Sequence, residues 1–319
     1  MIELKEISKK FGDTQAVKQV SFSVAREETL VLLGTSGCGK TTTLKMINRL
    51  IEPDAGQILI NNENIIDQNP DVLRKGIGYV MQNIGLFPHY TIAENIALVP
   101  KLLKWDQVKI INRTKELIAK LHLTETTLSM YPHELSGGQQ QRVGLARALI
   151  TDPSVLLMDE PFGALDNVTR TSIQKEFKAL AELKRKTIVM VTHDVLEAFE
   201  LADRICLMDK GEVVQIGTPK ELLYRPINDF AKSFLASQKL ILEFKVTNIQ
   251  DIWIYLPEET VHHGECETAD LSIWEAMELL RNKDRSALFI SGDNKAIKSI
   301  NFEQLTKGFN QYQNAQRHE

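Results

Sequence analysis

A glycine-rich run near the N-terminus combines residue types that bind phosphate groups. It fits the pattern G-x-x-x-x-G-K-[ST] between an apolar strand at 29–33 and a helix, which disfavours the alternative of an ordinary glycine turn. Glycines let the backbone curl so that successive N–H groups point at phosphate oxygens, and a helix N-terminus adds positive potential. Lys40 can reach the β- and γ-phosphates, and the Thr41 hydroxyl can ligate Mg²⁺. We therefore expect a nucleotide to be held by Gly34, Thr35, Ser36, Gly37, Cys38, Gly39, Lys40, Thr41 and Thr42.

Two adjacent carboxylates follow a second apolar run. Residues 155–158 predict a buried strand, and Asp159 and Glu160 come directly after it. At the carboxyl edge of a sheet, these side chains would face the phosphate-binding run. Asp159 would then hold the Mg²⁺ shell, and Glu160 would orient and polarise a water that attacks the γ-phosphate. A solvated strand end is the alternative for the pair alone, and the phosphate-binding run greatly reduces its weight.

Composition and charge restrict the class of protein. The chain has 319 residues, 43% of them hydrophobic, which is enough for one or two domains with a buried core. Its net charge of -4 disfavours nucleic acid as the main partner, since phosphate-backbone binding usually needs a basic face. Three scattered cysteines indicate a reduced compartment without a disulfide framework. No apolar run approaches the ~20 residues that span a bilayer, so action at a membrane would require another chain.

The elements that position these residues alternate between strands and helices. Strands are expected at 2–7, 21–24, 29–33, 155–158 and 187–191, and the pattern from 92 to 128 is helical, with apolar residues three and four apart. A hairpin-like stretch at 204–216 turns at Asp209-Lys210-Gly211. Strands followed by helical stretches predict a parallel α/β sheet.

A short run in the middle of the chain, Leu135-Ser136-Gly137-Gly138-Gln139, opens a predicted helix. Ser136 and the glycine N–H groups at this helix start would form a second phosphate cradle. Here the sequence resembles the ABC ATPase family, whose signature this run is. The resemblance implies an α/β P-loop NTPase fold (RecA-like) with an antiparallel β subdomain and a helical subdomain. It also implies a head-to-tail dimer, in which the signature of one subunit closes over the ATP held by the other.

Further positions match this family in the expected order. Phe11 falls where the family stacks an aromatic ring on adenine, and Gln82 falls at the Q-loop, which senses Mg²⁺ and water and faces the permease. Asp166 matches the D-loop, and His193 matches the switch histidine that contacts the γ-phosphate. Each of these residues alone has a structural alternative, so their joint order and spacing carry the inference. The resemblance assigns catalysis to Lys40, Gln82, Glu160 and His193, Mg²⁺ to Thr41, Gln82 and Asp159, and nucleotide contact to the phosphate-binding run, Phe11, Ser136, Gly137, Gly138, Gln139 and Asp166.

The stretch 77–103 narrows the resemblance. It is similar to the corresponding region of the bacterial glycine betaine, proline or choline importer ATPases, where these residues lie beside Gln82 at the permease contact. This implies a motor at the cytoplasmic face of the cell membrane, paired with an identical or a different nucleotide-binding subunit and served indirectly by a solute-binding protein. The alternatives are a motor for another small solute, an exporter motor, and a soluble ABC protein of translation or DNA repair. Those soluble proteins usually carry two cassettes or a long coiled coil, and neither is evident in this sequence.

A small accessory module is expected at 240–319, after a cassette at 1–236. It should contain a strand at 251–256, a helix at 272–280 that starts with a Ser272/Glu275 capping box, and a strand at 287–290. Residues 268–309 resemble a single cystathionine β-synthase (CBS) repeat, whereas those importers often end in a tandem pair. Regulation and a simple packing or dimerisation role stay equal alternatives. A metal cluster is the less favoured alternative to a solvated loop at His262, His263, Glu265 and Cys266.

Overall fold

The computed structural model describes residues 1–257, 266–282, 286–292 and 296–316. The chain divides into two compact units, Met1–Ile216 and Gly217–Glu319. This division falls before the boundary expected at 236–240, so the helices between 219 and 236 group with the second unit. The cassette at 1–236 and the accessory module at 240–319 stay predictions.

The first unit is built around a six-stranded sheet of order β10-β9-β3-β8-β7-β6. Its strands are β3 (Thr29–Gly34), β6 (Ile77–Val80), β7 (Val155–Asp159), β8 (Thr187–Val191), β9 (Arg204–Asp209) and β10 (Glu212–Gly217). The neighbours from β9 to β6 run parallel. Every residue of β7 and β8 is buried, as is typical of parallel strands that are covered on both faces. The predicted parallel α/β sheet is confirmed.

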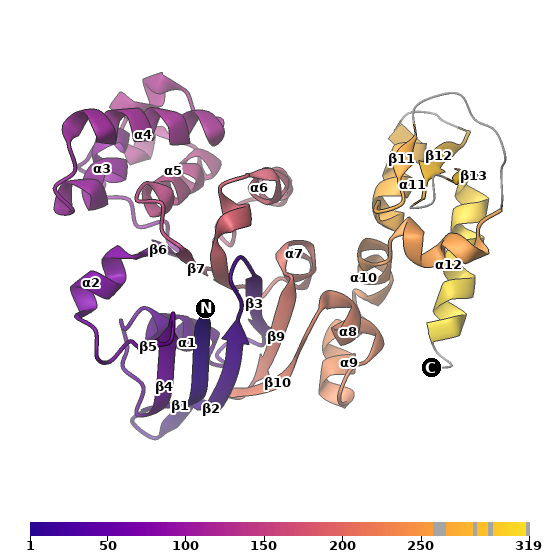
Figure 1. Ribbon diagram of the computed structural model, residues 1–319, viewed down its shortest axis with the longest axis horizontal. Helices are drawn as coiled ribbons and strands as arrows, with labels where there is room; N and C mark the ends of the chain where they lie inside the picture. Colours follow the sequence, from indigo (N-terminus) through magenta and orange to yellow (C-terminus); the bar gives the residue numbers. More distant parts are fainter. Residues whose placement is uncertain (258–265, 283–285, 293–295, 317–319) are drawn as a thin grey trace. The chain divides into compact units, whose positions relative to one another are not determined.

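A four-stranded antiparallel sheet of order β2-β1-β4-β5 forms another layer of this unit (Figure 1). It contains β1 (Ile2–Phe11), β2 (Thr14–Val24), β4 (Ala55–Ile60) and β5 (Glu63–Asn64). Helix α1 (Lys40–Ile47) contacts β2 of this sheet and β3, β7 and β8 of the parallel sheet. Its Leu44, Met46 and Ile47 are fully buried in the core that both sheets share. The helix that follows the phosphate-binding run is therefore fixed by packing on two sides.

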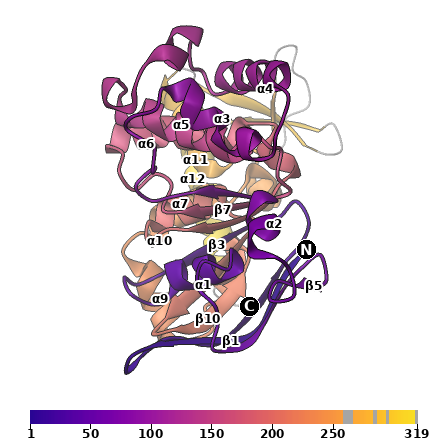
Figure 2. The ribbon, with the colours of Figure 1, turned by 90° about the vertical axis from the view of Figure 1, so that its left-hand side faces the viewer.

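A helical part lies at one end of the first unit (Figure 2). It comprises α3 (Ile92–Leu102), α4 (Gln107–Lys120), α5 (Gly137–Leu149) and the 3-10 helices η1 (Glu125–Ser129) and η2 (Pro132–Glu134). The helical pattern expected from 92 to 128 is broken at 103–106, where the Asp106 side chain accepts hydrogen bonds from the N–H groups of Val108 and Lys109 and starts α4. The other elements of the unit are α2 (Pro70–Lys75), α6 (Asn167–Ala179), η3 (Leu183–Arg185) and α7 (Val195–Leu201).

The second unit begins with α8 (Pro219–Tyr224), α9 (Asp229–Ala236), α10 (Lys239–Val246) and η4 (Ile249–Tyr255). After these come β11 (Glu267–Thr268), α11 (Ile273–Asn282), β12 (Leu288–Ser291), β13 (Ile297–Ile300) and α12 (Phe302–Gln316). Strand β12 pairs parallel with β11 and antiparallel with β13. The helix expected at 272–280 is confirmed with its capping box, since Ser272 N–H donates to Glu275 Oε2 (2.9 Å) and Glu275 N–H donates to Ser272 Oγ (3.1 Å).

The strand expected at 251–256 is wrong, because this segment forms the 3-10 helix η4. Ile249 and Ile252 are fully buried, whereas Ile254 is 79% exposed, so burial repeats every third residue rather than every second. The Asn248 N–H donates to the Asp251 side chain at 2.7 Å and closes the start of the helix. Because nearly all side chains of this segment are apolar, the sequence contains little information on which of them face the core.

The described part of the chain contains neither a membrane-spanning helix nor a ready cluster of metal ligands. None of the helices that the structure describes is long and apolar enough to cross a lipid bilayer. No group of three or more His, Cys, Asp or Glu side chains in the described part of the chain is arranged to hold a metal ion. Three residues of the metal alternative, His262, His263 and Glu265, lie outside the described residues.

Candidate nucleotide-binding site

Four strands of the parallel sheet lead directly into candidate residues. Strand β3 runs into the phosphate-binding run, β6 precedes Gln82, β7 ends at Asp159 before Glu160, and β8 precedes His193. Since these strands are parallel, their carboxyl ends lie at one edge of the sheet. The fold therefore gathers residues from distant parts of the sequence at this edge.

The phosphate-binding run curls into the N-terminus of α1. Gly39 has a backbone φ of 101°, a value that residues with a side chain rarely adopt. A Cβ at this position would also collide with the carbonyl oxygen of Ala16. The Lys40 side chain is buried, and its Nζ donates to the carbonyl oxygens of Gly34 (2.9 Å) and Thr35 (2.8 Å). The ammonium group is thus held inside the loop. The other residues of the run divide into the exposed Ser36 and Gly37, the buried Cys38, and the half-buried Thr41 and Thr42.

Thr41 connects the first turn of α1 to the end of β7. Its Oγ1 donates to Asp159 Oδ1 at 2.8 Å. Burial raises the pKa of Asp159, and the hydrogen bond from Thr41 and the charge of Lys45 partly offset this effect. A buried carboxylate next to a hydroxyl is a position where a bound cation would stabilise the charged form.

Two candidate side chains meet on one carboxylate oxygen. Oε2 of Glu160 lies 2.9 Å from Nε2 of Gln82 and 3.2 Å from Nδ1 of His193. The His193 side chain is 61% exposed and that of Glu160 is 18% exposed, so the group is open on the histidine side. The backbone of Glu160 has a φ of 44°, an uncommon value for a residue other than glycine. Its N–H donates to the carbonyl oxygen of Val191 at 3.0 Å. Strained backbone of this kind is often found at functional sites.

The signature residues begin α5. Ser136 N–H donates to Gln139 Oε1 (3.0 Å) and Gln139 N–H donates to Ser136 Oγ (3.3 Å), which makes a capping box. Gly138 permits close approach of α6, because a Cβ there would lie 2.9 Å from Cγ2 of Thr169. Among the described residues, no hydrogen bond joins Ser136, Gly137, Gly138 or Gln139 to the phosphate-binding run. Within the described part of the chain, the signature residues are thus not hydrogen-bonded to the phosphate-binding run.

Phe11 and Asp166 have structural contacts of their own. Phe11 is exposed at the end of β1, and Nζ of Lys9 lies 5.6 Å from the centre of its ring. Asp166 is the N-cap of α6, where Oδ1 accepts hydrogen bonds from the N–H groups of Val168 (3.1 Å) and Thr169 (3.0 Å). Hydrogen bonds from Thr169 and Val168 lower the pKa of Asp166. Neither residue is hydrogen-bonded to Glu160 within the part of the chain that the structure describes.

Two charged residues that hold the loops of this site, Arg170 and Glu197, were not predicted from the sequence. Arg170 of α6 contacts the loop after β7 and also the residue after His193. Glu197 of α7 is buried, and its Oε2 accepts a hydrogen bond from Thr192 Oγ1 at 2.6 Å. On sequence grounds alone, an arginine one turn into a helix and a glutamate in a first helical turn indicate solvated side chains.

Residues 17–163 match the family model described as ABC transporter. Over 300 residues the chain is 47% identical to the choline transport ATP-binding protein OpuBA of Bacillus subtilis (strain 168), a match that covers 93% of this chain and 77% of that protein. The chain belongs to the ATP-binding subunits of ABC transporters. This ABC ATPase is also 47% identical over 279 residues to the glycine betaine uptake system ATP-binding protein YehX of Escherichia coli (strain K12), covering 88% of this chain and 90% of that protein.

A solved structure supports the fold of this ABC ATPase. The ATP-binding cassette MJ0796, in a dimeric post-hydrolysis state bound to ADP and Pi, matches it with a TM-score of 0.61 and 36% sequence identity. The match covers 68% of this chain and 98% of that chain. The P-loop NTPase fold expected from the sequence is confirmed, and the ABC ATPase binds and hydrolyses ATP as a member of this family.

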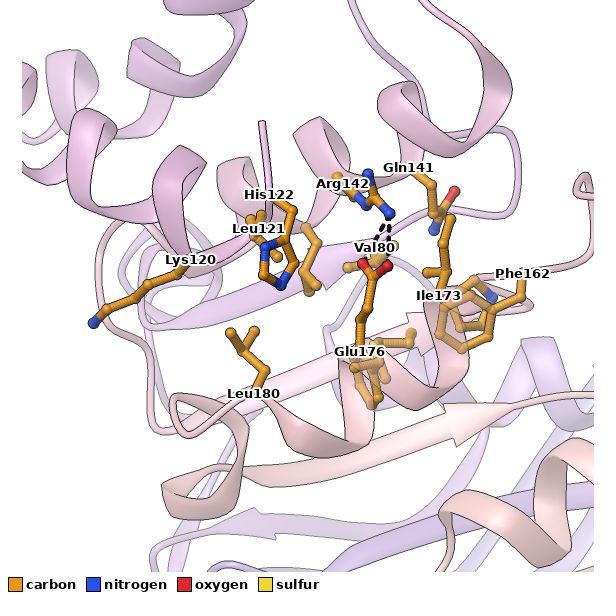
Figure 3. Close-up of a pocket in the computed structure, with 14 residues that line it drawn as sticks. Val80, Lys120, Leu121, His122, Gln141, Arg142, Phe162, Ile173, Glu176 and Leu180 are labelled. Carbon is orange, nitrogen blue, oxygen red and sulfur yellow. Dashed lines mark hydrogen bonds and ion pairs between the residues drawn. The ribbon is translucent and has the colours of Figure 1, made fainter. Parts of the chain in front are cut away.

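A separate apolar cavity of the ABC ATPase lies between α5 and α6 (Figure 3). Leu145 of α5 and Ile173 of α6 are among its lining residues, and none of the candidate nucleotide residues lines it. Its volume of about 20 Å³ leaves room for about one water molecule, so it is too small for a nucleotide. Beside it, Nη2 of Arg142 lies 2.8 Å from Oε2 of Glu176, and this ion pair joins the signature helix to α6.

Proposed function

We propose that this ABC ATPase energises the uptake of a compatible solute, of the glycine betaine, proline or choline type, through a separate membrane permease. The single observation that carries the motor role is the convergence of Gln82 and His193 on Glu160, at the sheet edge that also holds Thr41 and Asp159. The solute class is supported by the choline and glycine betaine transport functions named for two relatives that are each 47% identical.

The nucleotide would lie along the sheet edge between Phe11 and the phosphate-binding run. The exposed ring of Phe11 is available to stack on adenine. Lys40 would exchange the carbonyl oxygens of Gly34 and Thr35 for β- and γ-phosphate oxygens, because an ammonium group gains more from a charged acceptor than from a neutral one. The left-handed backbone at Gly39 favours this use, since it belongs to a curled loop at a helix N-terminus.

The donor set at Thr41, Asp159 and Gln82 suits Mg²⁺, which prefers oxygen ligands. Thr41 Oγ1 and Asp159 Oδ1 are already in contact, and burial leaves the Asp159 carboxylate with a raised pKa that a nearby cation would lower. When bound there, Mg²⁺ would neutralise negative charge on the β- and γ-phosphates. We propose that Thr41 and Asp159 are its main protein ligands and that Gln82 completes the shell.

Glu160 would act on the attacking water. Its carboxylate would accept a proton from the water or orient it for in-line displacement at the γ-phosphate. Gln82 and His193 would hold this carboxylate in place, and the exposed His193 would in addition contact the γ-phosphate. Positioning and charge stabilisation would provide most of the rate enhancement, as is general for phosphoryl transfer.

A second nucleotide-binding subunit, identical or different, would complete each site. The signature residues Ser136, Gly137, Gly138 and Gln139 begin a helix whose N-terminal end suits phosphate, and they make no hydrogen bond to the described phosphate-binding run of their own chain. The dimeric state of MJ0796 supports this arrangement. We therefore propose that Ser136 and the glycine N–H groups bind the ATP of the partner subunit, with Asp166 near the same junction.

The permease would dock on the loop that follows Gln82. Met81, Phe87 and Tyr90 are 47%, 49% and 45% exposed, which is unusual for three large apolar side chains within ten residues. Asn95 is fully buried beneath this loop, where its Nδ2 donates to the carbonyls of Phe87 and Tyr90 (each 3.1 Å). The loop is therefore preformed for an apolar partner at the cytoplasmic face of the membrane. A solute-binding protein would act through that permease and not on this chain.

The proposed function is tested by uptake of labelled glycine betaine, proline and choline after a salt upshift, in cells that lack this chain and redundant importers. The wild-type chain is expected to restore uptake of at least one of these solutes, and Glu160→Gln is expected to restore none. A matched control is Glu125→Gln, which neutralises an exposed glutamate of η1 and should restore uptake as the wild type does. Failure of the wild type with all three solutes contradicts the solute class, and restoration by Glu160→Gln contradicts the motor role.

A further inference from the structure

We propose that Arg170 is a positioning residue that keeps the loop after Glu160 aligned with the loop of His193; this rests on the hydrolytic roles proposed above for those two residues. Arg170 lies on α6, and its guanidinium group contacts both loops. Nε donates to the carbonyl of Phe162 (3.2 Å), Nη2 donates to the carbonyl of Leu165 (2.9 Å), and Nη1 lies 3.5 Å from Oδ2 of Asp194. The first two residues belong to the loop that begins at Glu160, and Asp194 directly follows His193.

The geometry of the guanidinium group explains why an arginine occupies this position. Its N–H donors diverge in one rigid plane, so one side chain can bind two carbonyl oxygens and a carboxylate at the same time. A lysine has a single nitrogen on a flexible chain and cannot hold both loops in one fixed geometry. Arg170 thus sets the separation of two loops that carry Glu160 and His193, whose Oε2 and Nδ1 atoms lie 3.2 Å apart.

The two carboxylate oxygens of Asp194 have different partners. Oδ1 caps α7 by accepting hydrogen bonds from the N–H groups of Leu196 (2.9 Å) and Glu197 (3.2 Å). Oδ2 faces Arg170. The residue is therefore held to its own helix by one oxygen and to α6 by the other. Asp194→Asn can keep the cap with its remaining oxygen while it loses the ion pair, which makes it a selective probe.

The histidine loop is also held by hydrogen bonds to the helix that follows it, α7. Thr192 Oγ1 accepts a hydrogen bond from the Asp194 N–H at 3.0 Å and donates to Oε2 of Glu197 at 2.6 Å. These contacts hold the loop onto α7, whereas Arg170 reaches across to the loop of Glu160. Local hydrogen bonds therefore shape the histidine loop, and Arg170 determines how it lies against the carboxylate.

The ion pair of Arg170 and Asp194 should contribute little to the stability of the fold, because both side chains are partly exposed. The side chains of Arg170 and Asp194 are 24% and 29% exposed, and partly exposed ion pairs contribute little to the stability of a fold. By contrast, a shift of about 1 Å in reacting groups can lower a catalysed rate about a hundredfold. Loss of Arg170 should therefore affect the rate of hydrolysis far more than the thermal unfolding temperature or nucleotide affinity.

The test measures ATP hydrolysis by the purified full chain for Arg170→Met, Arg170→Lys and Asp194→Asn. We expect Arg170→Met to lower kcat about tenfold or more with KM for ATP changed less than about twofold, and Arg170→Lys to recover part of the rate. Asp194→Asn should also lower kcat, and it should add little in the Arg170→Met background because both changes remove the same contact. The unfolding temperature of every variant should stay close to that of the wild type.

The control is Lys178→Met, which removes another ion pair between the same two helices. Nζ of Lys178 lies 3.0 Å from Oε1 of Glu200, away from both loops, so this variant should keep the wild-type kcat. The inference is overturned if Arg170→Met retains wild-type kcat, or if it loses rate only together with nucleotide affinity or folding. These outcomes differ from failure of the proposed function, which would appear as a wild-type rate in Glu160→Gln.

Discussion

At the scale of single residues, the site depends on carboxylates whose surroundings differ. Glu160 shares one oxygen with Gln82 and His193, whereas Glu197, four residues beyond His193, lies buried beneath the same loop. Burial raises the pKa of Glu197 to about 7, against the hydrogen bond from Thr192. The charge of Asp194 raises this pKa further, and Arg170 and His193 lower it. An uncharged Glu197 therefore suits the folded chain better than an ionised one.

This pKa predicts how the stability of the first unit depends on pH. In the unfolded chain Glu197 ionises near its ordinary pKa of 4.5, so the folded state loses stability as pH rises from about 4.5 through about 7. Glu197→Gln removes this loss and is expected to be more stable than the wild type at pH 8, by up to about 3 kcal/mol, with the difference vanishing near pH 4.5. Denaturant unfolding of both proteins across this range measures it. A wild type that is the more stable protein at pH 8 would contradict the prediction.

Some residue-scale features could be predicted from the sequence and others could not. Gln82, Glu160 and His193 each follow a strand, and parallel neighbouring strands must bring such residues to one edge. The shared oxygen on Glu160 and the left-handed backbone that accompanies it depend on tertiary packing and are absent from any local pattern. The same holds for the contact of Arg170 with Asp194, because these two residues become neighbours only when α6 packs on α7.

At the scale of elements, α6 connects the signature helix to the histidine loop. The Arg142–Glu176 ion pair ties it to α5, and the close approach at Gly138 brings the start of α5 against Thr169. On its other side, α6 contacts α7 and holds Asp194 through Arg170. Packing around α6 thus connects the start of α5 with the histidine loop.

Loss of the Arg142–Glu176 pair should loosen this packing. Glu176→Gln leaves a partly buried guanidinium whose Nε already lacks a hydrogen-bond partner among the described residues, so we expect the free energy of unfolding to fall by about 1 kcal/mol. Glu125→Gln, which breaks the exposed pair with Lys115, should cost no more than about 0.5 kcal/mol. Urea unfolding compares the two variants. Equal losses would mean that burial beside the cavity adds nothing to the pair.

Element types were predictable where a short apolar run or a capping pair of residues marked the element. The apolar runs 155–158 in β7 and 188–191 in β8 could be assigned as buried parallel strands, and the Ser272/Glu275 spacing correctly predicted a helix start. The segment 251–256 was predicted wrongly, because its apolar side chains are consecutive: Trp253 lies between Ile252 and Ile254, and Tyr255 lies between Ile254 and Leu256. There the Asn248 and Asp251 capping contact, rather than hydrophobic periodicity, indicates the helix.

At the scale of the whole molecule, one chain carries the parts of a site without joining them. The phosphate-binding run and the Glu160 group lie at the sheet edge, while the signature residues begin α5 and bond to neither among the described residues. A second subunit is the arrangement that would unite them, in agreement with the dimeric MJ0796 cassette. Within the second unit, 217–319, the resemblance of residues 268–309 to a single CBS repeat remains a prediction.

ATP-dependent dimerisation and hydrolysis by Glu160→Gln test the motor role most directly. Light scattering and ATPase assays of the purified chain, with and without ATP and Mg²⁺, would compare this variant with the wild type. We predict hydrolysis about a hundredfold or more below the wild-type rate, together with a stable dimer that forms only when ATP is present. Hydrolysis at the wild-type rate, or a variant that stays monomeric at saturating ATP, would contradict the roles assigned to Glu160 and to the signature residues.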